Sequence, residues 1–473
     1  MKTGNSRFLL IAACGMVLFI CMGAIKIIQF GTINIRVYQA FVALGLIGII
    51  NSKSVVLKQH NISRIFYLAF SFIFICFISM LVADYPIVTL KQTLLLFIYF
   101  LVSYVGYKAF NTSNNLKVYF ITLIIGSLIA YTYGYLQTIF PNIFHIYLER
   151  RNIGDLGAEI NFNSLFYRPS SFFSEGNEFG QFISFSSAMF IACSVYSVQR
   201  WIKILSRLSL IYVLPILMIN NSRGTIIAIA GMVVVMFMIS YKINIGYPEI
   251  LKYFFFSIVM LLVSILLLVY LILPNVPIFA DGNVMEWMIG RISGSLGSDD
   301  STFYGRLIVM WDGLLAFVTH PILGVGYGNM FTVIDQFGYA QFTGQNMGGI
   351  SGLVDTGNAT STNFFIDIAA ETGIFGLIFF VSLLVKIAKL SYRNITSNIH
   401  SLDFPFALGS HLAFWGMLIN SLSYSAVGLA IFWLNVGVIL GMSQIQSKKN
   451  TMNYGLNNDN VLVQNKNSGN VLS

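Results

Sequence analysis

Four arginines stand in short polar stretches between long apolar runs of the sequence. They are Arg168 in "YRPSSFFSEGNEFG", Arg223 in "NNSRGT", Arg291 in "IGRISGS" and Arg306 in "YGRLIVMW". A guanidinium group stays charged at any physiological pH, and its planar fork binds two phosphate oxygens at once. Several such groups on one face of a membrane protein would suit a phosphate or diphosphate ligand.

A simpler explanation exists for each arginine taken alone. Arginines at helix ends reach toward lipid headgroups or satisfy helix carbonyls. This explanation is weakest for Arg223, because the turn from Asn220 to Gly224 is so short that the side chain should sit at the mouth of a helix bundle. An arginine near the apolar layer costs at least about 2.5 to 3.5 kcal/mol unless it reaches water or a partner.

Two acids are candidates for proton transfer or for pairing with these arginines. Glu175 follows Arg168 by seven residues and precedes an apolar run. It is either a first-turn acid favoured by the helix dipole, an ion-pair partner, or a general base whose pKa is raised by burial. Glu371 lies inside a later apolar run, where we expect a structural partner for an arginine, although an acid within the membrane is also a functional candidate.

The remaining polar signals are less specific. His145 and His320 fall in predicted outer loops, and His320 precedes a proline, which favours a structural turn. Gly324, Gly326 and Gly328 form a Gly-x-Gly-x-Gly pattern with no strand before it. We therefore expect these glycines to form a turn, not a nucleotide-binding loop.

The elements that position these residues are membrane helices. The 473-residue chain is 56% hydrophobic, with a mean hydropathy of +0.77, far above the apolar content of a soluble domain. Apolar runs long enough to cross a bilayer recur along the chain and predict an all-α polytopic membrane protein with about twelve transmembrane helices. We place them near 8–25, 35–50, 65–83, 88–106, 117–139, 179–198, 204–220, 224–240, 251–273, 364–385, 405–421 and 425–445.

Basic residues set the predicted orientation, because those near helix ends resist translocation. Eighteen lysines and arginines fall on one side, among them Arg64, Lys386, Lys389 and Arg393, and this side should be the cytoplasm, with both termini. The first span lacks a convincing cleavage site, so we expect it to stay in the protein. The net charge of +9 is then a topology signal and gives no support to nucleic-acid binding. All four cysteines fall within predicted spans.

We expect one transmembrane domain over residues 1–445 and a disordered cytoplasmic tail over 446–473. Two long outer loops, 141–178 and 274–363, interrupt the domain. The second contains residues spaced as one amphipathic helix on the membrane surface or over a cavity. These are Leu307, Met310, Trp311, Leu314, Leu315 and Val318.

The order of four motifs resembles the O-antigen ligase and polymerase superfamily, which are multi-helix glycosyltransferases of the bacterial inner membrane. The motifs are "RPSSFFSEGNEFGQF", "NNSRGTIIAIAG", "GRLIVMWDGLLAF…HPILGVGYGN" and "STNFFIDIAAETGIFGL", over roughly residues 165–385. The resemblance implies a GT-C-like fold and a periplasmic cavity that binds an undecaprenyl-diphosphate-linked glycan. It also implies that Arg223 and Arg306 hold the diphosphate.

One departure from the ligase pattern separates two activities. Ligases carry a histidine before the asparagine that opens the helix after the large loop, whereas this chain has Thr362 before Asn363, with Glu371 and Gly373 in place. Threonine cannot accept a proton at neutral pH, so the sequence fits the more variable repeat-unit polymerases better than the ligases. A peptidoglycan-type polymerase of related architecture is a further alternative.

We therefore predict an O-antigen polymerase that works by inverting glycosyl transfer without metal or cofactor. Arg223, Arg306 and Glu175 are the predicted catalytic residues. The predicted substrate-binding residues are Arg168, Arg291, Thr362, Asn363 and Glu371. Partners would be membrane lipids, the lipid-linked oligosaccharide, a flippase and a chain-length regulator. A secondary transporter is the alternative of another class, but no second copy of the motif set is present.

Overall fold

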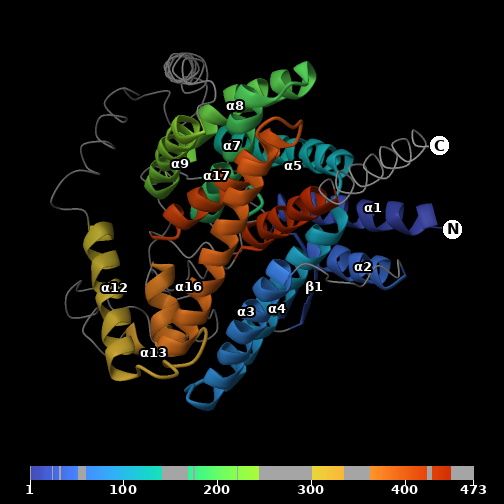
Figure 1. The fold of residues 1–473 in the computed structure, drawn as a ribbon. Helices are drawn as coiled ribbons and strands as arrows, with labels where there is room; N and C mark the ends of the chain where they lie inside the picture. Colours follow the sequence, from blue (N-terminus) through green and yellow to red (C-terminus); the bar gives the residue numbers. More distant parts are fainter. Residues whose placement is uncertain are drawn as a thin grey trace, which may run out of the picture.

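The computed structural model describes residues 2–23, 25–30, 33–51, 60–140, 169–173, 176–220, 222–243, 301–334, 363–422 and 429–448. These residues form an all-α polytopic membrane protein (Figure 1). The helices are α1 (Lys2–Ile20), α2 (Val37–Asn51), α3 (His60–Ile78), α4 (Pro86–Ala109), α5 (Ser113–Ile139), α7 (Gly176–Tyr196), α8 (Arg200–Asn220), α9 (Arg223–Lys242), α12 (Ser301–Thr319), α13 (Phe331–Ile334), α16 (Phe364–Asn398), α17 (Phe404–Asn420) and a last helix, Ala430–Lys448.

Eleven of the twelve predicted spans coincide with observed helices, and the twelfth, near 251–273, lies outside the described residues. Within the described part of the chain, seven helices are long and apolar enough to cross a membrane. The total of about twelve therefore stays a prediction. The last helix runs to Lys448, three residues past the predicted end of the membrane domain.

A β-hairpin between α1 and α2 was not predicted. Strands β1 (Lys26–Phe30) and β2 (Ile33–Arg36) pair antiparallel, with Phe30 opposite Ile33. Only two residues separate the strands, as in the tightest hairpins. The sequence "KIIQFGTINIR" is short and lies between two spans, so a scan for membrane helices treats it as a plain connection.

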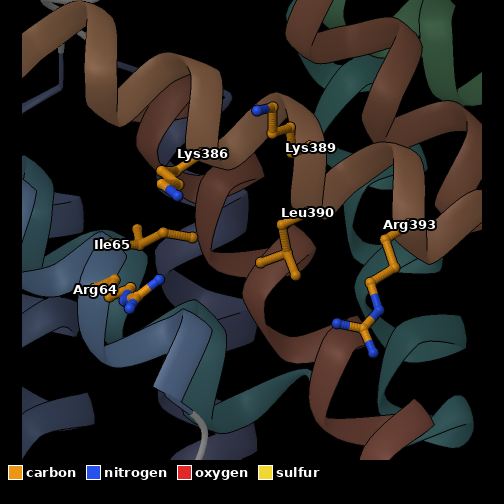
Figure 2. Close-up of a pocket in the computed structure, with 6 residues that line it drawn as sticks. All are labelled: Arg64, Ile65, Lys386, Lys389, Leu390 and Arg393. Carbon is orange, nitrogen blue, oxygen red and sulfur yellow. The ribbon is translucent and has the colours of Figure 1, made fainter.

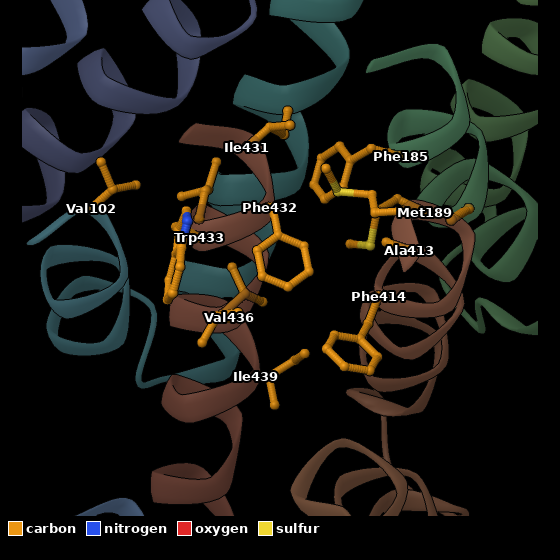
Figure 3. Close-up of a cluster of buried hydrophobic side chains, with 14 of the residues drawn as sticks. Val102, Phe185, Met189, Ala413, Phe414, Ile431, Phe432, Trp433, Val436 and Ile439 are labelled. Carbon is orange, nitrogen blue, oxygen red and sulfur yellow. The ribbon is translucent and has the colours of Figure 1, made fainter. Parts of the chain in front are cut away.

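Among the seven helices long and apolar enough to cross a membrane, α7 and the last helix are the most enclosed. In the most apolar stretch of each of these two helices, 89% and 83% of the residues are buried. The corresponding share is 33% for the α3 region and 39% for α4 and α9. Figure 3 shows Phe432 and Val436 of the last helix between Val102 of α4 and the side chains of α7 and α17. Helices α3, α4 and α9 therefore present much of their apolar surface outward, as lipid-facing helices do.

Small residues allow α4 and the last helix to approach closely. A Cβ atom on Gly437 would lie 2.6 Å from the carbonyl oxygen of Ser103, and one on Gly441 would lie 2.6 Å from that of Phe110. The hydroxyl of Ser103 donates to the carbonyl of Trp433 at 2.7 Å. Small residues spaced four apart and interhelical hydrogen bonds are the usual means of joining helices in lipid, where no hydrophobic force drives them together.

Helix α16 is two helices joined by a reversal, which corrects the predicted single span 364–385. Gly373 has φ 64° and ψ −165°, a conformation outside the helical region. The rings of Phe364 and Phe380 lie 4.9 Å apart, centroid to centroid, although sixteen residues of straight helix would separate them by about 24 Å. Residues 364–372 therefore fold back along residues 374–398, and Figure 1 shows the two orange segments side by side.

Candidate active site

The ends of five helices meet at one place, which we call the five-helix junction. Helices α8 and α17 end there, at Asn220 and at Asn420, and α7, α9 and α16 begin there. The junction brings together segments separated by up to about 250 residues of sequence. It contains the "SRG" and "TNFF" motifs at which the sequence placed Arg223 and Asn363.

Asn220 ties the end of α8 to the beginning of α7. Its buried amide group donates to the carbonyl of Pro169 at 3.0 Å and to the carbonyl of Gly176 at 2.9 Å. Pro169 and Gly176 directly follow Arg168 and Glu175 in the sequence. Asn220 therefore fixes the backbone beside both of these predicted site residues.

Arg223 is the first residue of α9, and its side chain is exposed. The backbone next to it is held against α7, because a Cβ atom on Gly180 would lie only 2.9 Å from Cβ of Ser222 and 2.3 Å from Oγ1 of Thr225. Only a glycine at position 180 permits this approach. The close packing fixes where the Arg223 side chain leaves the bundle.

The end of α17 connects Arg223 to the beginning of α16. The amide of Asn420 donates to Oγ1 of Thr225 at 3.5 Å, a long contact, and the carbonyl of Ser421 accepts from the Phe364 backbone N–H at 3.0 Å. The amide of Asn363 also donates to the carbonyl of Leu422 at 3.3 Å. Residues 420–422 thus form a bridge between the two motifs.

Asn363 is the N-cap of α16. Its side-chain oxygen accepts from the backbone N–H groups of Phe365 at 3.0 Å and Ile366 at 3.3 Å, as N-cap residues do. These contacts give Asn363 a clear structural role. Its role toward substrate stays a prediction.

The junction has the electrostatics of an anion site. The first turns of α7, α9 and α16 lie around it, and each helix N-terminus carries a partial positive charge, although the first N–H groups of α16 are already bonded to Asn363 and Ser421 and the first turns of α7 and α16 include the acids Glu178 and Asp367. The Arg223 guanidinium adds a full positive charge. A phosphate-bearing group placed here would meet the guanidinium of Arg223 and the partial positive charges of three helix N-termini.

The other predicted site residues are described in part or not at all. Arg168, Glu175, Arg291 and Thr362 lie outside the described residues, as does His145. The backbone of Arg306 lies in α12, and its side chain is outside the description. His320 is exposed at the end of α12, where Nδ1 lies 3.0 Å from the hydroxyl of Thr319 and the His320 carbonyl accepts from Gly324. The position of His320 in a turn agrees with the structural turn that was predicted from the sequence.

The three-glycine pattern holds the reversal in α16. The backbone N–H groups of Val325 and Gly326 donate to the carbonyls of Ala370 and Glu371 at 2.9 and 3.1 Å, and that of Ile374 donates to the carbonyl of Pro321 at 2.8 Å. Gly324, Gly326 and Gly328 all have positive φ, which glycine adopts without strain. The segment 320–330 is therefore a structural clamp on α16, as the turn prediction implied.

Glu371 belongs to this clamp. Its carboxylate accepts from the backbone N–H of Met330 at 3.4 Å, and it is buried. The described contacts of Glu371 are thus with the glycine-rich turn, and its predicted pairing with an arginine stays a prediction, because the side chains of Arg168, Arg291 and Arg306 lie outside the described residues. This contact could not be predicted from the sequence, because Met330 and Glu371 are more than forty residues apart.

The clamp also fastens α3 and α4. The side-chain oxygen of Asn329 accepts from the Tyr85 backbone N–H at 3.0 Å, and its amide donates to the hydroxyl of Thr89 at 2.7 Å, so that Asn329 caps α4 from another segment. The Tyr327 N–H donates to the hydroxyl of Ser79 at 3.0 Å. Because α12 leads directly into this clamp, the position of the helix that carries Arg306 is set by α3, α4 and α16 together.

Helix α12 is amphipathic in a different sense from the prediction. Trp311 and Val318 are exposed, while Val309 and Ala316 are buried on the face that packs against α16. Among the described side chains, Trp311 and Val318 therefore point away from the face that packs against α16. The predicted position on the membrane surface or over a cavity stays a prediction.

Four residues of the junction were not singled out from the sequence: Gly180 and Thr225, which lie inside two of the motifs, and Asn420 and Ser421, which lie outside all four. For Asn420 and Ser421 the only signal was a polar pair, "NS", at the end of an otherwise apolar run. Such a pair is common at helix ends. It cannot be recognised as part of the junction without knowing which other helix ends lie beside it.

The comparison with known families concerns the same part of the chain. A family model described as O-antigen ligase matches residues 208–381, a little over a third of the chain, from within α8 to within α16. This range contains Arg223, α12, the glycine clamp and the reversal at Gly373. No curated protein matches the chain. The match over these elements supports the resemblance to the O-antigen ligase and polymerase superfamily that the motifs indicated.

Proposed function

We propose that this protein is an O-antigen polymerase that joins undecaprenyl-diphosphate-linked repeat units at the five-helix junction. The superfamily consists of glycosyltransferase-like enzymes, and its substrates are lipid-linked oligosaccharides. The observation that carries the proposal is the position of Arg223 among three helix N-termini. This arrangement favours an anion, and the diphosphate is the anionic part of such a donor.

The reaction is a single displacement. A hydroxyl of the acceptor sugar attacks the anomeric carbon of the donor, the bond from that carbon to the diphosphate oxygen breaks, and lipid diphosphate leaves with the electron pair. Arg223 and Arg306 stabilise the charge that develops on the leaving oxygen. The anomeric configuration is inverted.

The proton of the acceptor hydroxyl passes to a base, for which Glu175 is our candidate. The next residue, Gly176, is held at the junction by a hydrogen bond from the side chain of Asn220. Asn220 lies three residues before Arg223 in the sequence. Thr362 takes the place of the ligase histidine, which favours polymerase over ligase. Arg168, Arg291, Thr362, Asn363 and Glu371 would support substrate binding or the geometry of the site.

The orientation follows from the basic residues. The junction and the clamp lie at the ends of helices whose other ends carry most of the described lysines and arginines, so we place the site in the periplasm and both termini in the cytoplasm. The membrane is then the bacterial inner membrane. A flippase would deliver the donor, and a chain-length regulator would be a natural partner.

The test is the surface polysaccharide of a strain that lacks this protein, separated by size on a gel. A polymerase predicts a ladder collapsed to core plus one repeat. Loss of that single repeat as well indicates the ligase activity named by the matching family. An unchanged ladder contradicts both activities and returns the transporter alternative.

A further inference from the structure

A basic pocket lies between α3 and α16 and is lined by none of the residues described at the five-helix junction. It encloses about 220 Å³ and is lined by Arg64 and Ile65 of α3 and by Lys386, Lys389, Leu390 and Arg393 of α16. Figure 2 shows Arg64 and Lys386 on either side of Ile65, with Leu390 and Arg393 further along α16. We call it the α3–α16 pocket.

The pocket combines four positive charges with no acidic lining residue. Lys386, Lys389 and Arg393 follow one another at helical spacings of three and four, where like charges repel and destabilise a helix. Arg64 adds a fourth charge from a helix more than three hundred residues away in the sequence. Basic residues near the membrane are enough to set the orientation of the helices. They do not have to converge on one cavity from two helices to do so.

The surroundings of the pocket are apolar and exposed. Tyr67 and Phe74 follow Arg64 along α3, Phe375 and Ile378 precede Lys386 along α16, and all four side chains are exposed. On α16, Phe375 and Ile378 fall on the same side of an ideal helix as Lys386, Lys389 and Arg393. A ligand with a phosphate in the pocket and alkyl chains along the two helices would match both surfaces.

We propose that the α3–α16 pocket binds the headgroup of an anionic phospholipid. Basic pockets between transmembrane helices are the usual sites for such headgroups. The cavity is smaller than the roughly 300–1,000 Å³ of ordinary small-molecule sites, which suits one headgroup whose chains stay outside. The negative charge of the lipid phosphate offsets part of the repulsion among the four positive charges and holds α3 beside the long segment of α16, independently of any reaction at the five-helix junction.

The test is the apparent Kd of the purified full-length protein for short-chain phosphatidylglycerol, measured by titration in a neutral detergent. We expect Arg64→Gln/Arg393→Gln to bind about 30-fold more weakly, since each basic residue near a headgroup changes the Kd by roughly fivefold and the variant removes two. The control is Lys117→Gln/Arg200→Gln, which removes two charges from the same end of the bundle outside the pocket. It should bind within about twofold of the wild type.

A second variant, Arg64→Lys/Arg393→Lys, keeps the charge and should recover most of the affinity. All these side chains lie at least partly exposed, and unfolding temperatures without lipid will verify that the variants fold. Unchanged binding by the Gln variant overturns the proposal, and so does equal weakening of the control. Inorganic phosphate or glycerol phosphate that binds as tightly as the lipid also overturns it, because the alkyl chains would then contribute nothing.

Discussion

Arg223 is the residue on which the proposed chemistry most depends. Lysine keeps the charge but loses the two-pronged contact with phosphate oxygens, so Arg223→Lys should reduce the transfer rate by roughly 100-fold or more, as when a transition-state donor is removed. The measurement is the length distribution of surface polysaccharide at matched protein levels. Arg306→Lys should behave in the same way, whereas alanine at Arg168 or Arg291 should shorten chains without abolishing them.

The control for Arg223→Lys is Arg200→Lys, at the first residue of α8 and the opposite end of the bundle, where the side chain is also exposed. This variant should leave the polysaccharide unchanged. Full-length polymer in strains with Arg223→Lys and with Arg306→Lys would show that no diphosphate is gripped by these arginines.

Asn220 has a positioning role that substitution can separate from general stability. Asn220→Ala removes two hydrogen bonds and leaves the carbonyls of Pro169 and Gly176 without that donor, at a cost of about 1–3 kcal/mol in the free energy of unfolding. Thermal unfolding in detergent measures this cost. The polysaccharide should also shorten, because the backbone beside Glu175 loses its anchor.

Asn398→Ala is the matched control. Asn398 is buried at the other end of the bundle, and its amide donates to the carbonyl of Asn394 at 2.8 Å. A similar loss of stability with normal polysaccharide is expected. If both variants shorten the polymer equally, the effect of Asn220 is one of stability alone.

At the scale of elements, the reversal at Gly373 is the feature most sensitive to substitution. Gly373→Ala would force a side chain into φ 64° and place Cβ 2.2 Å from the carbonyl oxygen of Ile322. The backbone strain alone costs about 1–3 kcal/mol, and the clash adds to it. We expect a large fall in the yield of folded, monodisperse protein and in its unfolding temperature.

Gly231→Ala is the comparison variant. Gly231 lies within α9, and its Cβ would meet only the flexible side chain of Ile419. Alanine favours helix over glycine by up to about 1 kcal/mol, so this variant should be neutral or slightly stabilised. A Gly373→Ala protein as stable as Gly231→Ala would contradict the clamp between residues 320–330 and α16.

Most helices could be predicted from the sequence, because a long apolar run in lipid has one way to satisfy its backbone. The reversal in α16 could not, since "AAETGIFG" is as apolar as a continuous span and the clamp that bends it is distant in sequence. Arg223 and Asn363 could be named from motifs. Their connection through residues 420–422 depends on which helix ends meet, and hydropathy carries no such information.

At the scale of the whole molecule, the two ends of the chain pack into one core. The main cluster of buried residues extends from Leu9 to Ile445, and the last helix lies against α4 through Gly437. Gly437→Leu should separate these helices, since even a Cβ atom would lie 2.6 Å from the carbonyl of Ser103. The expected result is a lower unfolding temperature, measured in detergent, with an expression loss greater than that of Gly231→Leu.

Whether arginines alone can stabilise the leaving diphosphate is tested most directly with purified full-length protein in detergent. The protein is given synthetic undecaprenyl-diphosphate-linked repeat units and excess EDTA, and the products are separated by size. We predict oligomers with the wild type and roughly 100-fold slower formation with Arg223→Lys. Complete dependence on added Mg²⁺ or Mn²⁺ would contradict the arginine mechanism and direct attention to the acids Glu175, Asp299 and Asp300 as metal ligands.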